Sequence, residues 1–66
     1  MKVTINGEEH NLNQTLNMSA LMEHLGVEPN QVAIERNLEI VPKSLHGEVE
    51  VAEGDVIEIV EFIGGG

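Results

Sequence analysis

The sequence predicts an α+β fold, in which a mixed sheet of four to five strands is crossed by one main helix. Three features support this prediction. An Asn-Gly pair directly follows an alternating segment near the start of the chain, which is the strongest short-range signal for a β-hairpin. The next stretch repeats apolar residues at helical spacing. The segments after it are short, apolar and rich in β-branched residues, as strands are.

The hairpin is predicted from residues 3–12. Val3 and Ile5 alternate with polar residues, and Asn6-Gly7 follows at once. Both central positions of the favoured two-residue turn need a positive φ, which Asn and Gly tolerate. We expect the return strand over residues 8–12.

One short amphipathic helix is predicted next. Its apolar stripe has the i, i+3, i+4, i+7 spacing of a single helix face and consists of Met18, Leu21, Met22 and Leu25. Asn17 is the expected N-cap. Gly26 suits the left-handed residue that ends a helix, and Val27 can supply the apolar contact that often follows. Pro29 makes continuation beyond that point unfavourable. The stripe has to cover a sheet, since no second helix is visible.

Several strands follow the helix. Residues 32–34 begin an extended segment, and residues 40–41 resume it after a break. Pro42 ends that segment or confines it to an edge, because proline has no N–H to donate. Residues 43–48 are expected to form a loop or a single turn. Residues 48–51 then alternate between glutamate and valine.

The last strand is predicted to be central and buried on much of both faces, because it is the most apolar stretch of the chain. A Gly54-Asp55 turn precedes it, and its apolar residues are Val56, Ile57, Ile59, Val60, Phe62 and Ile63. A hairpin that continues through a helix into further strands of one mixed sheet is the β-grasp arrangement. The right-handed crossover preference favours a first strand parallel to the last.

The length and charge of the chain limit what it can do. Its 66 residues leave room for one domain, in which an enzyme pocket with its own nucleophile, base and lid is hard to fit. Twelve acidic residues against three basic ones give a net charge of −9, which disfavours nucleic acid and anionic membranes as partners. The acidic excess either attracts a basic protein or only keeps the chain soluble. The absence of cysteine excludes disulfides and thiolate chemistry. Without a signal peptide or a long apolar run, we expect a soluble cytoplasmic protein.

Three glycines, Gly64, Gly65 and Gly66, end the chain directly after the last predicted strand. We therefore divide it into a folded domain of residues 1–63 and a flexible C-terminal glycine tail of residues 64–66. At an average glycine frequency of about 7%, three in a row at one chosen place arise by chance roughly once in 3,000 chains. Terminal glycines add nothing to fold stability, which indicates another role. The alternative is a flexible end or a cloning remnant.

A chain end without Cβ atoms can enter a channel that larger side chains would block, and three residues reach about 10 Å. The tail can thus present the α-carboxylate of Gly66 inside a partner's active site. Adenylation by ATP is the common biological route from a carboxylate to an acyl electrophile. An amine, a thiol or a sulfur donor can attack that electrophile, and the tail alone leaves all three open.

Three internal segments, together with the tail, resemble the ThiS family, the sulfur carriers of thiamine thiazole biosynthesis. The segments are VAIERN at 32–37, EIVPKS at 39–44 and EGDVIEI at 53–59. The similarity covers essentially the whole chain, whereas a terminal Gly-Gly alone is shared with ubiquitin and several relatives. Residues 11–17 form a slightly longer connection than is usual for the family, which leaves the start of the helix uncertain.

The resemblance implies a ubiquitin-like β-grasp domain that carries sulfur, performs no catalysis and binds no cofactor of its own. A ThiF-like adenylyltransferase of the ubiquitin-activating type would use ATP to adenylate Gly66. A persulfide donor would then supply sulfur to form a thiocarboxylate, which a ThiG-like thiazole synthase would accept. Gly64 and Gly65 would thread into the partner's active site. Phe62 and Ile63 are expected to contact partners, with core packing as the alternative.

Other interpretations stay open. A MoaD-like sulfur carrier for molybdopterin and a ubiquitin-like protein modifier would use the same tail, and a plain interaction module would not need it. Metal binding is disfavoured because the three histidines, His10, His24 and His46, fall on separate predicted elements. The acidic residues of the last third, from Glu48 to Glu61, are expected on solvent-facing or rim positions. Arg36 and Lys43 either contact a partner or form surface ion pairs with glutamates.

Overall fold

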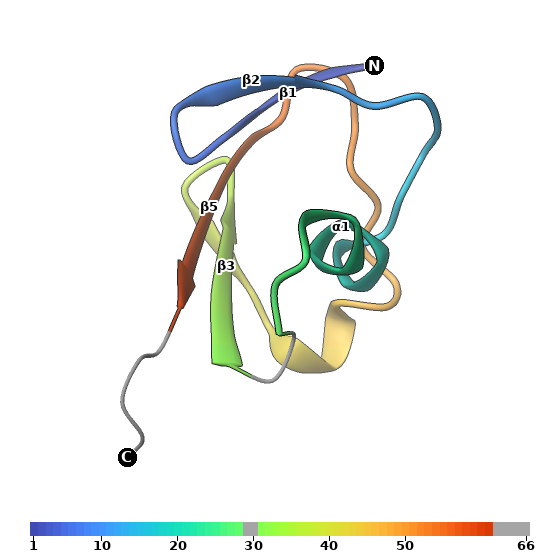
Figure 1. Ribbon diagram of the computed structural model, residues 1–66. Helices are drawn as coiled ribbons and strands as arrows, with labels where there is room; N and C mark the ends of the chain where they lie inside the picture. Colours follow the sequence, from blue (N-terminus) through green and yellow to red (C-terminus); the bar gives the residue numbers. More distant parts are fainter. Residues whose placement is uncertain (29–30, 62–66) are drawn as a thin grey trace.

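The computed structural model describes residues 1–28 and 31–61 and confirms the α+β prediction. One helix lies across one face of a five-stranded mixed sheet with the strand order β2-β1-β5-β3-β4 (Figure 1). The elements are β1 Lys2–Ile5, β2 Glu8–Asn11, α1 Met18–Leu25, β3 Val32–Arg36, β4 Glu39–Val41, the 3-10 turn η2 Lys43–Leu45 and β5 Val56–Glu61. As predicted, β1 runs parallel to β5, while the other neighbouring pairs are antiparallel.

The first hairpin has the predicted turn. Asn6 and Gly7 have φ values of 49° and 81°, and Ile5 lies opposite Glu8 across the two-residue loop. The Asn6 side chain also bridges to the central strand. Its Oδ1 accepts from the Ile59 amide at 2.7 Å, and its Nδ2 donates to the Ile59 carbonyl at 3.2 Å. Asn6 therefore joins the hairpin turn to β5 as well as shaping the turn.

Both helix caps are confirmed. Asn17 precedes α1, and its Oδ1 accepts a hydrogen bond from the Ala20 amide at 2.7 Å. Gly26 has a φ of 75°, and its amide donates to the Glu23 carbonyl at 3.1 Å. The Val27 amide donates to the Met22 carbonyl at 2.9 Å, which completes a Schellman motif. The longer connection before the helix therefore ends at an ordinary N-cap.

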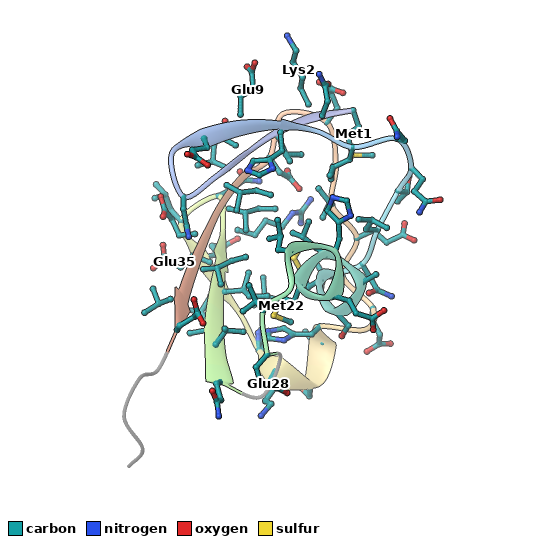
Figure 2. The ribbon with its side chains drawn as sticks, viewed as in Figure 1. Met1, Lys2, Glu9, Met22, Glu28 and Glu35 are labelled. Atoms are coloured by element: carbon teal, nitrogen blue, oxygen red, sulfur yellow. The ribbon has the colours of Figure 1, made fainter. Side chains whose placement is uncertain are left out.

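The core lies between α1 and the sheet. Figure 2 shows Met22 pointing from the helix into this space, while Glu35 lies on the opposite side of the sheet. Met18, Leu21 and Met22 on the helix, and Ile34 and Ile57 on the sheet, are each 0% exposed. A fully buried side chain of this size contributes about 1.5–3 kcal/mol relative to exposure, so this aliphatic layer is the main source of stability.

The burial predicted for the last strand is correct for only one of its faces. β5 does occupy the centre of the sheet, but only Ile57 and Ile59 face the core, at 0% and 9% exposure. Val56 and Val60 are 45% and 58% exposed. Alternate residues of a strand point to opposite faces, and α1 covers only one face of the sheet. Phe62 and Ile63 lie outside the described residues.

The break between β3 and β4 is a second tight hairpin turn. Asn37 and Leu38 have φ values of 52° and 72°. The left-handed conformation costs an L-residue such as leucine about 1–2 kcal/mol. Leu38 is also 89% exposed, so no burial of its own side chain offsets that cost. The Asn37 Oδ1 accepts from the Val56 amide at 2.9 Å and fixes the turn to the start of β5.

The stretch between η2 and β5 crosses the helix side without forming a strand. The predicted single turn after Pro42 is η2. The glutamate–valine alternation that follows makes only one isolated bridge, between Asn17 and Glu50. Val51 is nevertheless 2% exposed, and its amide donates to the Leu16 carbonyl at 2.8 Å. This segment therefore covers the start of the helix with a valine side chain.

Candidate functional site

The central strand leads directly to the part of the chain for which chemistry is predicted. Strand β3 pairs with β5 along its whole length, from Arg36 opposite Ile57 to Val32 opposite Glu61. Beyond Ile57, the other edge of β5 is held at Ile59 by the Asn6 side chain. The strand that precedes the tail is thus fixed by backbone partners as far as Glu61. The predicted site residues Phe62, Ile63, Gly64, Gly65 and Gly66 lie outside the described residues.

The face of the sheet away from α1 carries exposed aliphatic side chains. We call this set the outer apolar face, and it consists of Ile40, Val56 and Val60, with exposed fractions of 64%, 45% and 58%. Glu35 lies opposite both Ile40 and Glu58, so two glutamates share this face with the apolar residues. Val60 lies opposite Ala33, near the end of β5 from which the tail continues. Apolar side chains exposed on the uncovered side of a sheet make this face a candidate contact surface, because a partner that covered it would bury them.

The sequence predicts partner contacts at Phe62 and Ile63, whereas the outer apolar face was not predicted. The sequence nevertheless contains a pattern that indicates this face. Val56 and Val60 alternate with the core residues of β5, and the chain predicts only one helix to cover the sheet. Strict alternation therefore requires these valines to face away from the helix.

A buried carboxylate organises the opposite end of β5. Asp55 is 5% exposed. Its Oδ2 accepts from the Arg36 Nε at 2.7 Å and from the Ala52 amide at 2.8 Å, and its Oδ1 accepts from the Asn37 Nδ2 at 3.0 Å. Burial acts to raise the pKa of Asp55. The three hydrogen bonds and the Arg36 charge outweigh burial and hold that pKa below its ordinary value of 3.8.

This arrangement corrects two expectations. Asp55 was placed with the solvent-facing acidic residues, but it is buried in a network. Arg36 was expected to pair with a surface glutamate or a partner, and its partner is Asp55. Both oxygens of Asp55 are already occupied by donors, so the carboxylate is structural and is not available as a general base.

The histidines do not come together. His10 is on β2 and His24 is exposed in the last turn of α1. His46 is 5% exposed, with its Nε2 3.0 Å from the Val41 carbonyl oxygen. Within residues 1–28 and 31–61, no group of three or more His, Asp or Glu side chains could hold a metal ion. Over the same ranges, no helix has the length and apolar character needed to cross a membrane.

Comparisons with known proteins give a consistent result. The model of the ThiS family matches residues 3–66. The sulfur carrier protein ThiS of Bacillus subtilis is 48% identical over 46 residues, which is 70% of either chain. The crystal structure of the thiamine biosynthesis protein ThiS from Geobacter metallireducens superimposes with a TM-score of 0.86 over the full length of both chains, at 30% identity.

A longer relative also matches the whole chain. The thiazole synthase of Paramagnetospirillum magneticum is 56% identical over 66 residues. The chain spans only 20% of the length of that relative. A region similar to this chain therefore makes up about a fifth of a larger polypeptide.

Proposed function

Because the chain belongs to the ThiS family, we propose that it is a sulfur carrier in thiamine biosynthesis whose reactive group is the α-carboxylate of Gly66. The observation that carries the proposal is the family match over residues 3–66, which includes the glycine tail. The similarity to a Bacillus protein named as a sulfur carrier and to a solved ThiS structure supports the same assignment.

The proposed cycle begins with adenylation of the tail by a ThiF-like enzyme. The reacting group is the α-carboxylate of Gly66. Its oxygen attacks the α-phosphorus of ATP, and pyrophosphate leaves. The product is an acyl adenylate, whose carbonyl carbon is now open to a sulfur nucleophile.

The second step exchanges adenylate for sulfur. The terminal sulfur of a persulfide attacks the Gly66 carbonyl carbon and AMP leaves, which gives an acyl disulfide. A second thiol attacks the distal sulfur of that disulfide and releases the thiocarboxylate together with a new disulfide. Thiazole synthase then takes the sulfur and returns the carboxylate.

The chain's own contribution is to present the tail. Strand β5 is paired as far as Glu61, three residues before the tail, and the outer apolar face lies on the same sheet, with Val60 one residue before Glu61. A partner can bind this face while its channel accepts the glycines. The acid, base and phosphate chemistry then belongs to the partner, in keeping with a carrier that is consumed and recharged.

The proposal of thiazole synthase as sulfur acceptor draws on the longer relative. There a region similar to this chain occurs within a polypeptide that is named thiazole synthase. Carrier and acceptor within one polypeptide would have a raised effective concentration, which favours transfer between them. By analogy, we propose that this chain delivers its sulfur to a thiazole synthase.

The test is sulfur loading followed by intact mass measurement. The protein is incubated with ATP, a ThiF-like adenylyltransferase and a persulfide source. Replacement of one oxygen by sulfur raises the mass by nearly the same amount as oxidation of Met1, Met18 or Met22, so alkylation of the thiocarboxylate and fragmentation are needed to locate the change. A matched chain lacking Gly65 and Gly66 serves as the control.

Sulfur mapped to Gly66, and absent from the truncated control, is the expected result. Loading of the truncated chain, or an unmodified full-length terminus beside an adenylyltransferase that is active on a known carrier, would refute the proposal. Covalent ladders of larger proteins bearing this chain would instead indicate a protein modifier.

A further inference from the structure

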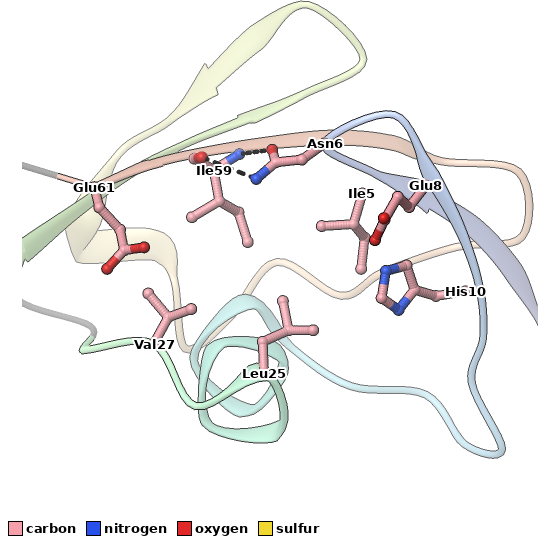
Figure 3. Close-up of a pocket in the computed structure, with 8 residues that line it drawn as sticks. All are labelled: Ile5, Asn6, Glu8, His10, Leu25, Val27, Ile59 and Glu61. Atoms are coloured by element: carbon pink, nitrogen blue, oxygen red, sulfur yellow. Dashed lines mark hydrogen bonds between the residues drawn. The ribbon is translucent and has the colours of Figure 1, made fainter.

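A hollow lies on the helix side of the sheet, between the end of α1 and the first hairpin. Figure 3 shows Leu25 and Val27 facing Ile5 and Ile59 across it. Ile5 and Ile59 are 4% and 9% exposed, and the two residues from the helix end are half-buried. Aliphatic side chains therefore line the hollow both on the sheet and on the helix end.

The rim of the hollow is acidic. Glu61 lies at one end beside Val27, while Glu8 and His10 lie at the other (Figure 3). Both glutamates are exposed, and His10 is half-buried. Asn6 also borders the hollow, but both polar atoms of its side chain are bonded to the Ile59 backbone. The carboxylates of Glu8 and Glu61 are thus the anionic acceptors at the rim.

The volume limits what the hollow can hold. The hollow is open to solvent and has a volume of about 210 Å³, below the roughly 300–1,000 Å³ of pockets that bind small molecules and cofactors. That space suits one long side chain. Lysine and arginine bury their aliphatic stems on apolar surface while the charged head stays in contact with water or with an acceptor.

We propose that this hollow is a docking socket for one lysine or arginine side chain of a protein partner. The stem of the incoming side chain packs between the helix end and Ile59, and its head pairs with Glu8 or Glu61. The net charge of −9 favours the approach of a basic surface. This socket lies on the side of the sheet opposite the outer apolar face, so it is a second contact region.

The partner concerned is an enzyme that receives the tail, a step that rests on the proposed function. Glu61 is both the last residue of β5 and part of the socket rim. A protein that takes residues 64–66 into its active site must therefore lie close to the socket. A basic side chain at the mouth of that enzyme's channel would fix the orientation of the carrier.

The first test does not depend on sulfur transfer. Nα-acetyl-arginine methylamide is titrated into the full chain at low salt while the methyl signals of Leu25, Val27 and Ile59 are followed by NMR. The double variant Glu8→Gln/Glu61→Gln removes the rim charges. Glu48→Gln/Glu50→Gln removes the same charge from exposed positions outside the socket and is the matched control.

We expect saturable shifts confined to the socket methyl groups in the wild type and the control. In the rim variant we expect binding about two- to fivefold weaker, as for the loss of one exposed ion pair. Shifts spread over the whole acidic surface, or equal affinities in the two double variants, would refute the proposal that this hollow binds a basic side chain.

The second test measures the partner. The same variants are compared as substrates of the ThiF-like adenylyltransferase. The rim variant should show a KM raised about fivefold with kcat unchanged, and the control a change below about twofold. Equal KM values in the two double variants would overturn the assignment of this partner. A wild type that the enzyme does not adenylate at all would count against the proposed function, and the NMR titration would still decide the socket.

Discussion

Replacing Asp55 by Asn tests whether the buried carboxylate holds the start of β5. The change keeps the size of the side chain but turns one acceptor oxygen into a donor and removes the charge. Asp55 accepts from Arg36, Asn37 and the Ala52 amide, and Asn can satisfy these donors only in part. Hydrogen bonds to charged groups contribute about 1.5–3 kcal/mol each. Arg36 has a side chain that is 32% exposed, so solvent screens part of that bond.

We therefore expect Asp55→Asn to lower the free energy of unfolding by about 2–3 kcal/mol at pH 7. In a domain this small, that loss lowers Tm by roughly 10–20 °C. Circular dichroism during thermal and urea unfolding measures both quantities. The double variant Arg36→Gln/Asp55→Asn separates the pair from the two remaining hydrogen bonds.

The pH dependence provides a second, independent readout. The pKa of Asp55 is lower in the folded state than its ordinary value of 3.8. Its contribution to stability is therefore complete above about pH 4 and is lost as the pH falls through the folded-state pKa. The difference between wild type and Asp55→Asn should shrink over that range. The difference is the useful quantity, because protonation of the other carboxylates also relieves repulsion in a chain of charge −9. A loss below 0.5 kcal/mol, or a difference that stays constant down to about pH 3, would refute this account.

Three further substitutions test the turns and the outer apolar face. Leu38→Asn should raise the free energy of unfolding by about 1 kcal/mol, because Asn tolerates the left-handed conformation better than Leu does. Urea unfolding measures this, and a loss of stability would contradict the prediction. Asn6→Gly keeps the positive φ but removes both hydrogen bonds to Ile59. It should therefore lower the free energy of unfolding by about 1–2 kcal/mol in the same urea experiment. An unchanged unfolding midpoint would show that these two bonds contribute nothing to stability. Val60→Gln should leave stability within about 0.5 kcal/mol while raising the KM of the adenylating enzyme, and an unchanged KM would remove Val60 from the contact surface.

The features that the sequence predicted correctly are decided within a few residues. Asn6-Gly7 forms its turn because these two residue types tolerate positive φ. Asn17 caps the start of the helix and Gly26 caps its end, each through a hydrogen bond to a backbone group three residues away. The single helical stripe and the apolar last strand then leave few ways to bury both, and this is why the fold class and the parallel β1–β5 pairing followed.

The features that were missed depend on long-range contacts. Asp55 stands among exposed glutamates in the sequence, and its bonds to Arg36 and Asn37, 19 and 18 positions away, distinguish it from them. Leucine disfavours the left-handed conformation, so its own residue type does not predict Leu38 in such a turn. The pairing of Arg36 with Glu39 leaves a two-residue loop, and this loop imposes the positive φ on Leu38. The exposure of Val60 depends on how many layers cover the sheet, which hydrophobicity alone does not reveal.

These observations assign separate roles to the two ends of β5. At its start, the Asp55 network joins the strand to the turn between β3 and β4. Near its end, Asn6 bonds to Ile59, and Val32 lies opposite Glu61. Within the described residues, most side-chain hydrogen bonds of the sheet thus hold this strand in position and in register. The proposed carrier role needs this more than it needs a catalytic pocket, because a partner that holds the folded domain can locate the proposed reactive carboxylate only if the strand before the tail has one position.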